Sequence, residues 1–279
     1  MKVDFKFVPS FKFKNDKISK RSIFFMHIPK CGGTTIDNIF AKLSIILKNF
    51  NFKRLKYDKS KNKIKLLESD INKRHFISGH LDYNFVENID SIFKCTVVRE
   101  PSARVLSHYR FMLYKLKKTN EEYPFEMFIE DEIGSNRDNL ITRHFSGFLD
   151  LKKPITEQEK NKALINIEFF DHINSFDNWD NFLSYILSYF GLPSILYSKY
   201  QQHDYTFFYS PDKNDYDLIK KYYKYDYEIF SNIIKKNKFF DTKNNKEYDK
   251  DICIVSPYFN KELKLYSEKE VKELFLKNK

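Results

Sequence analysis

A lysine, two glycines and two threonines stand together near the start of the chain, in the segment Pro29-Lys30-Cys31-Gly32-Gly33-Thr34-Thr35. These residue types suit a loop that binds a phosphate-like group. Lysine supplies a mobile cation, glycine allows close backbone approach, and threonine hydroxyls donate hydrogen bonds. The lysine precedes the glycines, whereas the Walker A loop for ATP or GTP has the order GxxxxGK[ST]. A plain turn without a ligand would need a glycine but none of the other residues. The segment therefore predicts an anion-binding loop of a different type.

The residues on either side of this segment predict a strand, a tight loop and a helix. The apolar run that begins at Ile23 stops at Pro29. After Thr35 the apolar residues recur at the spacing of one helical face, at Ile36, Ile39, Phe40, Leu43, Ile46 and Leu47. The N-terminus of a helix offers free backbone N–H groups and the positive end of a dipole to an anion. The predicted elements therefore place the loop where a phosphate site is expected.

A second motif joins a strand, an arginine and a helix that begins with proline. Residues 93–98 are β-branched and apolar enough to predict a buried strand, and Arg99 stands at its C-terminal edge. Pro101 suits the first turn of a helix, and Ser107 lies further along it. A guanidinium fork and a hydroxyl near a helix start fit a dianionic phosphate. If this segment stood alone, pairing of Arg99 with Glu100 or a backbone carbonyl would be the favoured interpretation.

A third segment supplies a candidate general base. Phe76 and Ile77 predict a short strand, Gly79 marks its exit, and His80 follows. This places His80 at the carboxyl edge of the sheet, where open α/β folds bind ligands. Histidines are more often structural or merely exposed, and the chain has seven. His80 stands out because it lies between the two phosphate motifs, whereas we expect His27 to pack or to orient its neighbours.

Taken together and in this order, the two phosphate motifs resemble those of the sulfotransferases that use 3′-phosphoadenosine 5′-phosphosulfate (PAPS). The resemblance is to sulfotransferase family 2, which includes the carbohydrate and heparan sulfate O-sulfotransferases. It implies transfer of a sulfuryl group to a hydroxyl on a carbohydrate or glycan, with adenosine 3′,5′-bisphosphate (PAP) as the leaving product. It implies that His80 and Lys30 are catalytic, His80 as general base. The cofactor-binding residues that it implies are Lys30, Cys31, Gly32, Gly33, Thr34, Thr35, Arg99 and Ser107.

The resemblance extends, more weakly, over residues 21–240. The segment 138–147 is similar to a helix that lies beside the active-site cleft in the same family. We therefore expect Asn139 and Arg143 to contact the acceptor. Residues 225–230 resemble a late helix of the family.

The length and composition favour one large domain. At 279 residues the chain could form one large α/β domain or two small ones, but no Pro/Gly/Ser-rich linker divides it. We expect an α/β fold with a P-loop-like, mainly parallel central sheet flanked by helices, within residues 21–240. Residues 1–20 would be a basic tail or an edge strand, and residues 241–279 a C-terminal extension of unassigned role.

The formal net charge of +11 would attract a polyanionic cofactor and an acidic glycan. A specific nucleic-acid partner would require a recognisable module or a concentrated basic face, and neither is visible. The three cysteines, Cys31, Cys95 and Cys253, lack metal-ligand spacing, so no metal is expected. The sequence shows no signal-peptide pattern and no apolar run of membrane-spanning length. Golgi members of the family that it resembles begin with a membrane anchor, so the resemblance implies a cytoplasmic, bacterial protein.

Two other functions remain open. A small-molecule kinase that uses ATP would need a Mg²⁺-binding carboxylate near the loop. Asp37 and Glu100 are the nearest candidates, but neither directly ends an apolar strand. A non-catalytic basic protein that binds RNA or another polyanion would show an affinity set by salt and no preference for a 3′-phosphate.

Overall fold

The computed structural model describes residues 5–11, 21–55, 75–149, 153–198, 209–236, 250–255 and 264–276, and it has the predicted α/β fold. Within this part of the chain, a five-stranded central sheet has the strand order β3-β4-β2-β5-β6, and each described pair is parallel. Its strands are β2 (Ile23–Met26), β3 (Asn51–Leu55), β4 (His75–Gly79), β5 (Phe93–Val98) and β6 (His172–Ser175).

The strand order makes the chain connections diverge at the carboxyl edge of the sheet. The chain leaving β2 passes to β3 on one side, whereas the chain leaving β5 passes to β6 on the other side. Two neighbouring strands whose connections diverge in this way mark the point where open α/β sheets bind ligands. All residues of β2 and β5 are buried, as expected of parallel strands covered on both faces.

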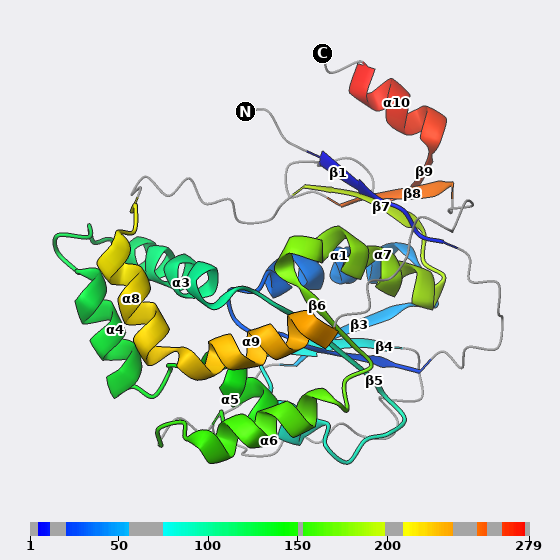
Figure 1. The fold of residues 1–279 in the computed structure, drawn as a ribbon. Helices are drawn as coiled ribbons and strands as arrows, with labels where there is room; N and C mark the ends of the chain where they lie inside the picture. Colours follow the sequence, from blue (N-terminus) through cyan, green and yellow to red (C-terminus); the bar gives the residue numbers. More distant parts are fainter. Residues whose placement is uncertain are drawn as a thin grey trace.

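Helices cover both faces of the central sheet (Figure 1). One face packs against α1 and α7, and the opposite face packs against α5, α6 and α9. The described helices are α1 (Gly33–Ile46), α3 (Pro101–Leu116), α4 (Phe125–Gly134), α5 (Leu140–Ser146), α6 (Glu157–Ile167), α7 (Trp179–Phe190), α8 (Lys213–Tyr222), α9 (Lys224–Lys236) and α10 (Glu268–Leu276), with short 3₁₀ turns at Tyr83–Phe85 and Phe176–Asn178.

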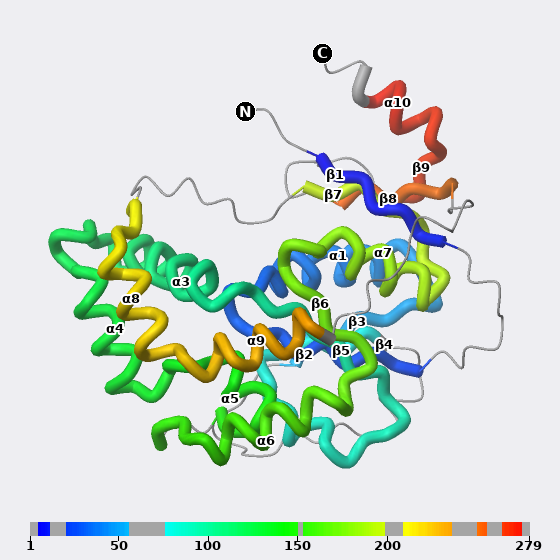
Figure 2. The backbone as a smooth tube through the Cα atoms, viewed as in Figure 1, coloured from blue at the N-terminus to red at the C-terminus, as the bar shows by residue number. Residues whose placement is uncertain are grey.

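A second sheet, which the sequence analysis did not predict, lies on the far side of α1 and α7 (Figure 1). Its strand order is β1-β7-β8-β9, with bounds Phe5–Val8, Ser194–Ser198, Asp251–Val255 and Leu265–Ser267. Strand β1 occupies one edge, in line with the edge-strand alternative for residues 1–20. The tube in Figure 2 shows β1 and α10 on the same side of the molecule. The strands of this sheet come from all three predicted regions, 1–20, 21–240 and 241–279. The boundaries between these regions stay a prediction.

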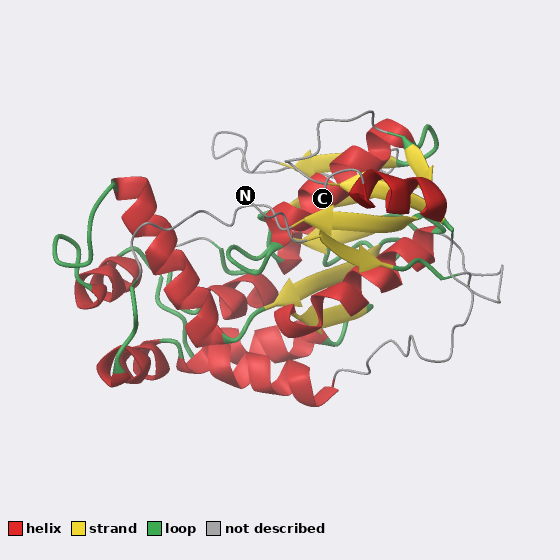
Figure 3. Cartoon of the chain, turned by 90° about the horizontal axis from the view of Figure 1, so that it is seen from above, coloured by secondary structure: helices red, strands yellow, loops and turns green. Residues whose placement is uncertain are grey.

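Helices α3, α4 and α8 form a lobe at one end of the molecule, away from the strands (Figure 3). Its core is aromatic, and the Tyr109 hydroxyl donates to the carbonyl of Tyr123 at 2.6 Å. Helix α3 begins directly after β5, so the lobe extends from the carboxyl edge of the central sheet. None of the described helices combines the length and the apolar character that a membrane span requires.

Candidate active site

The predicted phosphate loop connects β2 to α1, as its residue pattern indicated. Its backbone turns through left-handed conformations at Lys30 (φ 67°) and at Gly32 (φ 87°), the residue before the helix. The N-cap residue, Gly32, has no side chain to cap the helix, and the first turn holds no acidic residue. The N–H of Thr35 donates to the Gly32 carbonyl at 3.0 Å, and the start of the helix presents its other N–H groups and the positive end of its dipole toward an anion.

The packing of the protein itself requires both glycines of the loop. A Cβ at Gly32 would lie 2.8 Å from atoms of the Phe176 and Trp179 rings. A Cβ at Gly33 would lie 2.2 Å from the ring of His27. Neighbouring rings thus occupy the space of both missing side chains. The sequence analysis attributed the glycines to close approach of an anion, and these contacts provide a second reason.

Lys30 and Arg99 meet where β2 and β5 end. The Arg99 Nη1 atom donates to the Lys30 carbonyl at 3.5 Å, and its guanidinium lies 4.8 Å from the centre of the Phe176 ring. Lys30 Nζ lies 4.3 Å from the centre of the Phe111 ring. Burial, together with the charge of Arg99, lowers the pKa of Lys30 to about 8. Two cations held on aromatic faces beside a helix N-terminus form a site suited to a polyanion.

The other predicted cofactor residues differ in exposure, and Thr34 and Thr35, in the first turn of α1, are partly exposed. Cys31 is buried, and burial raises the pKa of its thiol to about 11. The neutral thiol leaves the backbone as the part of Cys31 that could bind an anion. Ser107 is partly exposed on α3, the helix that begins two residues after Arg99.

His80 follows β4 at the same edge of the sheet. Its Nδ1 atom lies 2.8 Å from the backbone carbonyl of His27. A carbonyl only accepts, so the neutral imidazole carries its hydrogen on Nδ1 and keeps a lone pair on Nε2. The residue is exposed, but its Nδ1 edge is partly buried. This desolvation, with a further contribution from His27, lowers the pKa of His80 to about 4. At neutral pH His80 is therefore an uncharged ring that can accept a proton at Nε2.

Asp37, on α1, is a buried acceptor that the sequence analysis considered only as a Mg²⁺ ligand. Its Oδ1 atom accepts from the Ser78 hydroxyl at 2.5 Å, and its Oδ2 atom lies 3.2 Å from His27 Nδ1 and 3.3 Å from Arg54 Nε. The Glu100 carboxylate accepts from the backbone N–H of Ala103 at 2.7 Å and so caps α3. Both candidate Mg²⁺ ligands are thus already engaged by donors within the protein.

No group of three or more histidine, cysteine, aspartate or glutamate side chains within the described ranges is placed to hold a metal ion.

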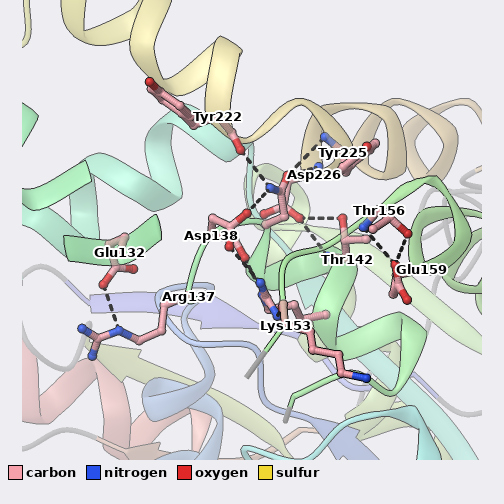
Figure 4. Close-up of polar contacts among 12 residues, drawn as sticks. Glu132, Arg137, Asp138, Thr142, Lys153, Thr156, Glu159, Tyr222, Tyr225 and Asp226 are labelled. Atoms are coloured by element: carbon pink, nitrogen blue, oxygen red, sulfur yellow. Dashed lines mark hydrogen bonds and ion pairs between the residues drawn. The ribbon is translucent and has the colours of Figure 1, made fainter. Parts of the chain in front are cut away.

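The predicted acceptor residues Asn139 and Arg143 lie in the interior, exposed by 2% and 0%. The Asn139 amide donates to the Asp138 carboxylate and to the Tyr222 carbonyl, both at 2.8 Å. The Arg143 guanidinium donates to Asp138 at 2.8 Å and to the Lys153 carbonyl at 3.1 Å. Figure 4 shows Asp138, Tyr222 and Lys153 around this network. These contacts favour a structural role, and acceptor binding by the two residues stays a prediction.

The family model described as the sulfotransferase family matches residues 18–231. The chain belongs to the sulfotransferase family. No curated protein matches this sulfotransferase. Among solved structures, it is similar to a sulfotransferase from Alicyclobacillus acidocaldarius, with 10% sequence identity and a TM-score of 0.43, over 78% of this chain and 97% of that chain.

Three of the predicted residues of this sulfotransferase come together although they are far apart in the sequence. Lys30, His80 and Arg99 each follow one of three neighbouring parallel strands, namely β2, β4 and β5. Because parallel strands end at the same edge, an anion site and a candidate base share one side of the sheet. The sequence analysis missed Ser78 and Arg54 and did not identify Asp37 as their acceptor. The one local signal was an acidic residue, Asp37, beside the apolar face of the first predicted helix.

Proposed function

We propose that this sulfotransferase uses PAPS as its donor and transfers the sulfuryl group to a hydroxyl on a carbohydrate or glycan. The observation that carries the proposal is the contact of the Arg99 guanidinium with the Lys30 carbonyl, 3.5 Å from Nη1 to O, at the point where strand connections diverge. The start of α1, with Gly32 as its N-cap residue, follows Lys30 by three residues. Fixed cations and helix N–H donors together fit a nucleotide with phosphates at both its 5′ and 3′ positions.

When bound, PAPS would supply the sulfuryl group and PAP would be the product that leaves. The N–H groups at the start of α1 and the hydroxyls of Thr34 and Thr35 would bind the 5′-phosphate. Arg99 and Ser107 would bind the 3′-phosphate. Lys30, with a pKa of about 8, is largely cationic at neutral pH and would stabilise negative charge on the bridging oxygen.

His80 would take the proton of the acceptor hydroxyl at Nε2, because its Nδ1 atom already donates to the His27 carbonyl. Its lowered pKa keeps the ring neutral at physiological pH. The negative charge of cofactor phosphates nearby would raise this pKa and so strengthen the base when the donor is bound.

The proposed acceptor is a glycan because of the family resemblance, and the net charge of +11 supports an acidic one. Of the two alternatives, an ATP-dependent kinase is disfavoured by the contacts that Asp37 and Glu100 already make within the protein. The RNA-binding alternative makes a different prediction about ligand choice, which the following experiment measures.

Thermal unfolding with PAP, ADP or a short RNA separates these functions. A ligand stabilises the folded state by RT ln(1 + [L]/Kd), about 2.7 kcal/mol at one hundred times Kd. We expect PAP to raise the melting temperature far more than ADP or RNA does, and Arg99→Ala to erase most of the difference between PAP and ADP. Arg21→Ala is the matched control. Arg21 also lies against a phenylalanine ring, that of Phe93, but at the opposite end of the sheet. Equal shifts with PAP and ADP in the native protein would contradict the proposal.

A further inference from the structure

The buried carboxylate of Asp37, on α1, contacts residues of β3, of β4 and of the segment after β2, near the sheet edge that holds His80. Asp37 of α1 is exposed by only 1%. It accepts from Ser78 on β4, from Arg54 on β3 and from the side chain of His27, the residue after β2. With three donors on its two oxygens, the carboxylate is well satisfied for a buried charge.

His27 connects this carboxylate to His80 in two ways. Its backbone carbonyl receives the Nδ1 hydrogen of His80 at 2.8 Å. Its ring lies against the ring of His80, with centroids 4.1 Å apart. The His27 ring also fills the space that a Cβ at Gly33 would occupy. The backbone N–H of His27 donates to the Gly79 carbonyl at 2.9 Å, so the residue before His80 is also held by His27. The orientation of His80 therefore depends on where His27 lies.

We propose that Asp37 is a positioning residue for His80. By holding the His27 side chain, it fixes the carbonyl and the ring that set the orientation and the tautomer of the base. This inference rests on the proposed role of His80. The hydrogen-bonded path from His80 ends at a backbone carbonyl, which cannot take up a proton and pass it to Asp37. Asp37 therefore acts through placement and not as a proton relay.

The charged and titratable groups around His80 indicate how this placement would appear in its titration. The charges of His27 and Arg54 disfavour the protonated ring of His80, whereas the hydrogen bond to the His27 carbonyl and the charge of Asp37 favour it. His144, on α5, also interacts electrostatically with His80. Loss of the Asp37 charge alone would lower the pKa of His80 still further. Loss of the ordered His27 contact would remove the hydrogen bond but would also let water reach the ring. Because desolvation is the largest cause of the lowered pKa, this second change would move the pKa back toward its ordinary value of about 6.5.

Imidazole NMR of ¹⁵N-histidine-labelled protein tests the inference without an acceptor or a cofactor. His80→Ala identifies the His80 signals. In the native protein we expect a single tautomer with its hydrogen on Nδ1. In Asp37→Asn the donors from Ser78, His27 and Arg54 share a single acceptor oxygen, so His27 is held less firmly. We therefore expect His80 to populate both tautomers and its pKa to lie closer to the ordinary histidine value. An unchanged His80 tautomer and pKa in Asp37→Asn would overturn the inference.

Asp171→Asn is the matched control. Asp171 is also paired with an arginine, Arg21 at 2.6 Å, but it lies before β6 at the opposite end of the sheet. Its substitution should leave the His80 signals unchanged. If Asp37→Asn does not fold, His27→Phe carries the same test, because it breaks the same contact from the other partner and keeps a ring beside His80. An unchanged His80 tautomer in His27→Phe would equally overturn the inference.

The kinetic expectation is a fall in kcat of about 10²-fold in Asp37→Asn, the size of loss that a small misplacement of a catalytic group can cause. The Kd for PAP should stay within about threefold of the native value, since Asp37 contacts none of the predicted phosphate ligands. A merely structural role would lower the melting temperature and leave kcat per folded molecule unchanged. Should PAP fail to bind the native protein, the proposed function fails, while the NMR result still decides whether Asp37 orients His80.

Discussion

At the scale of single residues, the site depends on the two ring nitrogens of His80. One is fixed by the His27 carbonyl and the other is left to accept a proton. His80→Ala should lower turnover by about 10²–10⁴-fold, the usual contribution of a general base. It should leave PAP binding unchanged, because His80 contacts no cofactor phosphate in the proposed arrangement. Radiolabelled sulfate transfer and PAP calorimetry measure the two effects separately.

The proposed role of His80 also predicts how activity changes with pH. A protonated His80 cannot accept a proton, so kcat/KM for PAPS should fall as the pH drops through the pKa of His80. That pKa is lowered to about 4 in the free enzyme, and the acid limb should therefore lie well below the ordinary histidine range. His108→Gln is the control, since His108 pairs with Glu132 on α4 at 3.3 Å. Loss of activity in His108→Gln but not in His80→Ala would show that the base was assigned to the wrong histidine.

Lys30 is the second residue whose substitution should separate chemistry from binding. Lys30→Ala should lower turnover by about 10²–10³-fold, the usual effect of removing one donor that stabilises transition-state charge. PAP affinity should fall less, because Arg99 and the helix N–H groups remain. Lys48→Ala, which removes an exposed lysine beyond the far end of α1, is the control. Near-native turnover in Lys30→Ala would exclude a catalytic role for this side chain.

The local residue pattern predicted the places of Lys30, His80 and Arg99 because each ends an apolar strand. It could not predict Asp37 as a structural acceptor, because the partners of that carboxylate lie on other strands. Ser78, for example, is 41 positions away in the sequence. The interior positions of Asn139 and Arg143 were missed for the same reason, since their partners include the carbonyls of Tyr222 and Lys153.

At the scale of elements, the junction between the loop and α1 is set by Gly32. Gly32→Ala must place a Cβ at φ 87°, 2.8 Å from two aromatic rings. Left-handed backbone alone costs a residue with a Cβ about 1–2 kcal/mol, and the ring contacts add to this. We expect urea unfolding to show a loss of at least that size, together with weaker PAP binding.

Gly134→Ala is the matched substitution, because a Cβ at this last residue of α4 would meet no atom within 4 Å. Its unfolding free energy should stay the same or rise by up to about 0.5–1 kcal/mol. Equal losses in both alanine variants would mean that the conformation of Gly32 does not matter to the loop.

The elements next to the site could be predicted because strand, glycine and helix signals are local. The second sheet could not, since β1 pairs with β7 from the other end of the domain, with Phe5 opposite Ser198. Nothing in a four-residue strand such as β1 specifies a partner that far along the chain. Helix α7, which packs between the two sheets, is buried on more than one side for this reason.

At the scale of the whole molecule, three histidines whose pKa is lowered in the folded protein should link stability to pH. Burial lowers the pKa of the buried His144 to about 3 and that of the partly buried His172 to about 4, and the pKa of His80 is likewise lowered to about 4. The unfolded chain binds a proton at each site below a pKa of about 6.5, whereas the folded protein does not. The unfolding free energy should therefore be highest above pH 6.5 and should fall as the pH drops toward 4.

His172→Phe tests this linkage. His172 lies against the rings of Tyr185 and Phe182, with centroids 4.4 and 5.7 Å away, and its buried Nε2 atom has no hydrogen-bond partner among the residues that the structure describes. A phenylalanine keeps the ring contacts and removes the titrating group. Between pH 7.5 and 5, urea unfolding should show the native protein losing about 2 kcal/mol more than the variant, the linkage expected for one histidine with this pKa shift. Parallel stability profiles for the two proteins would show that His172 titrates in the folded state as it does in the unfolded chain.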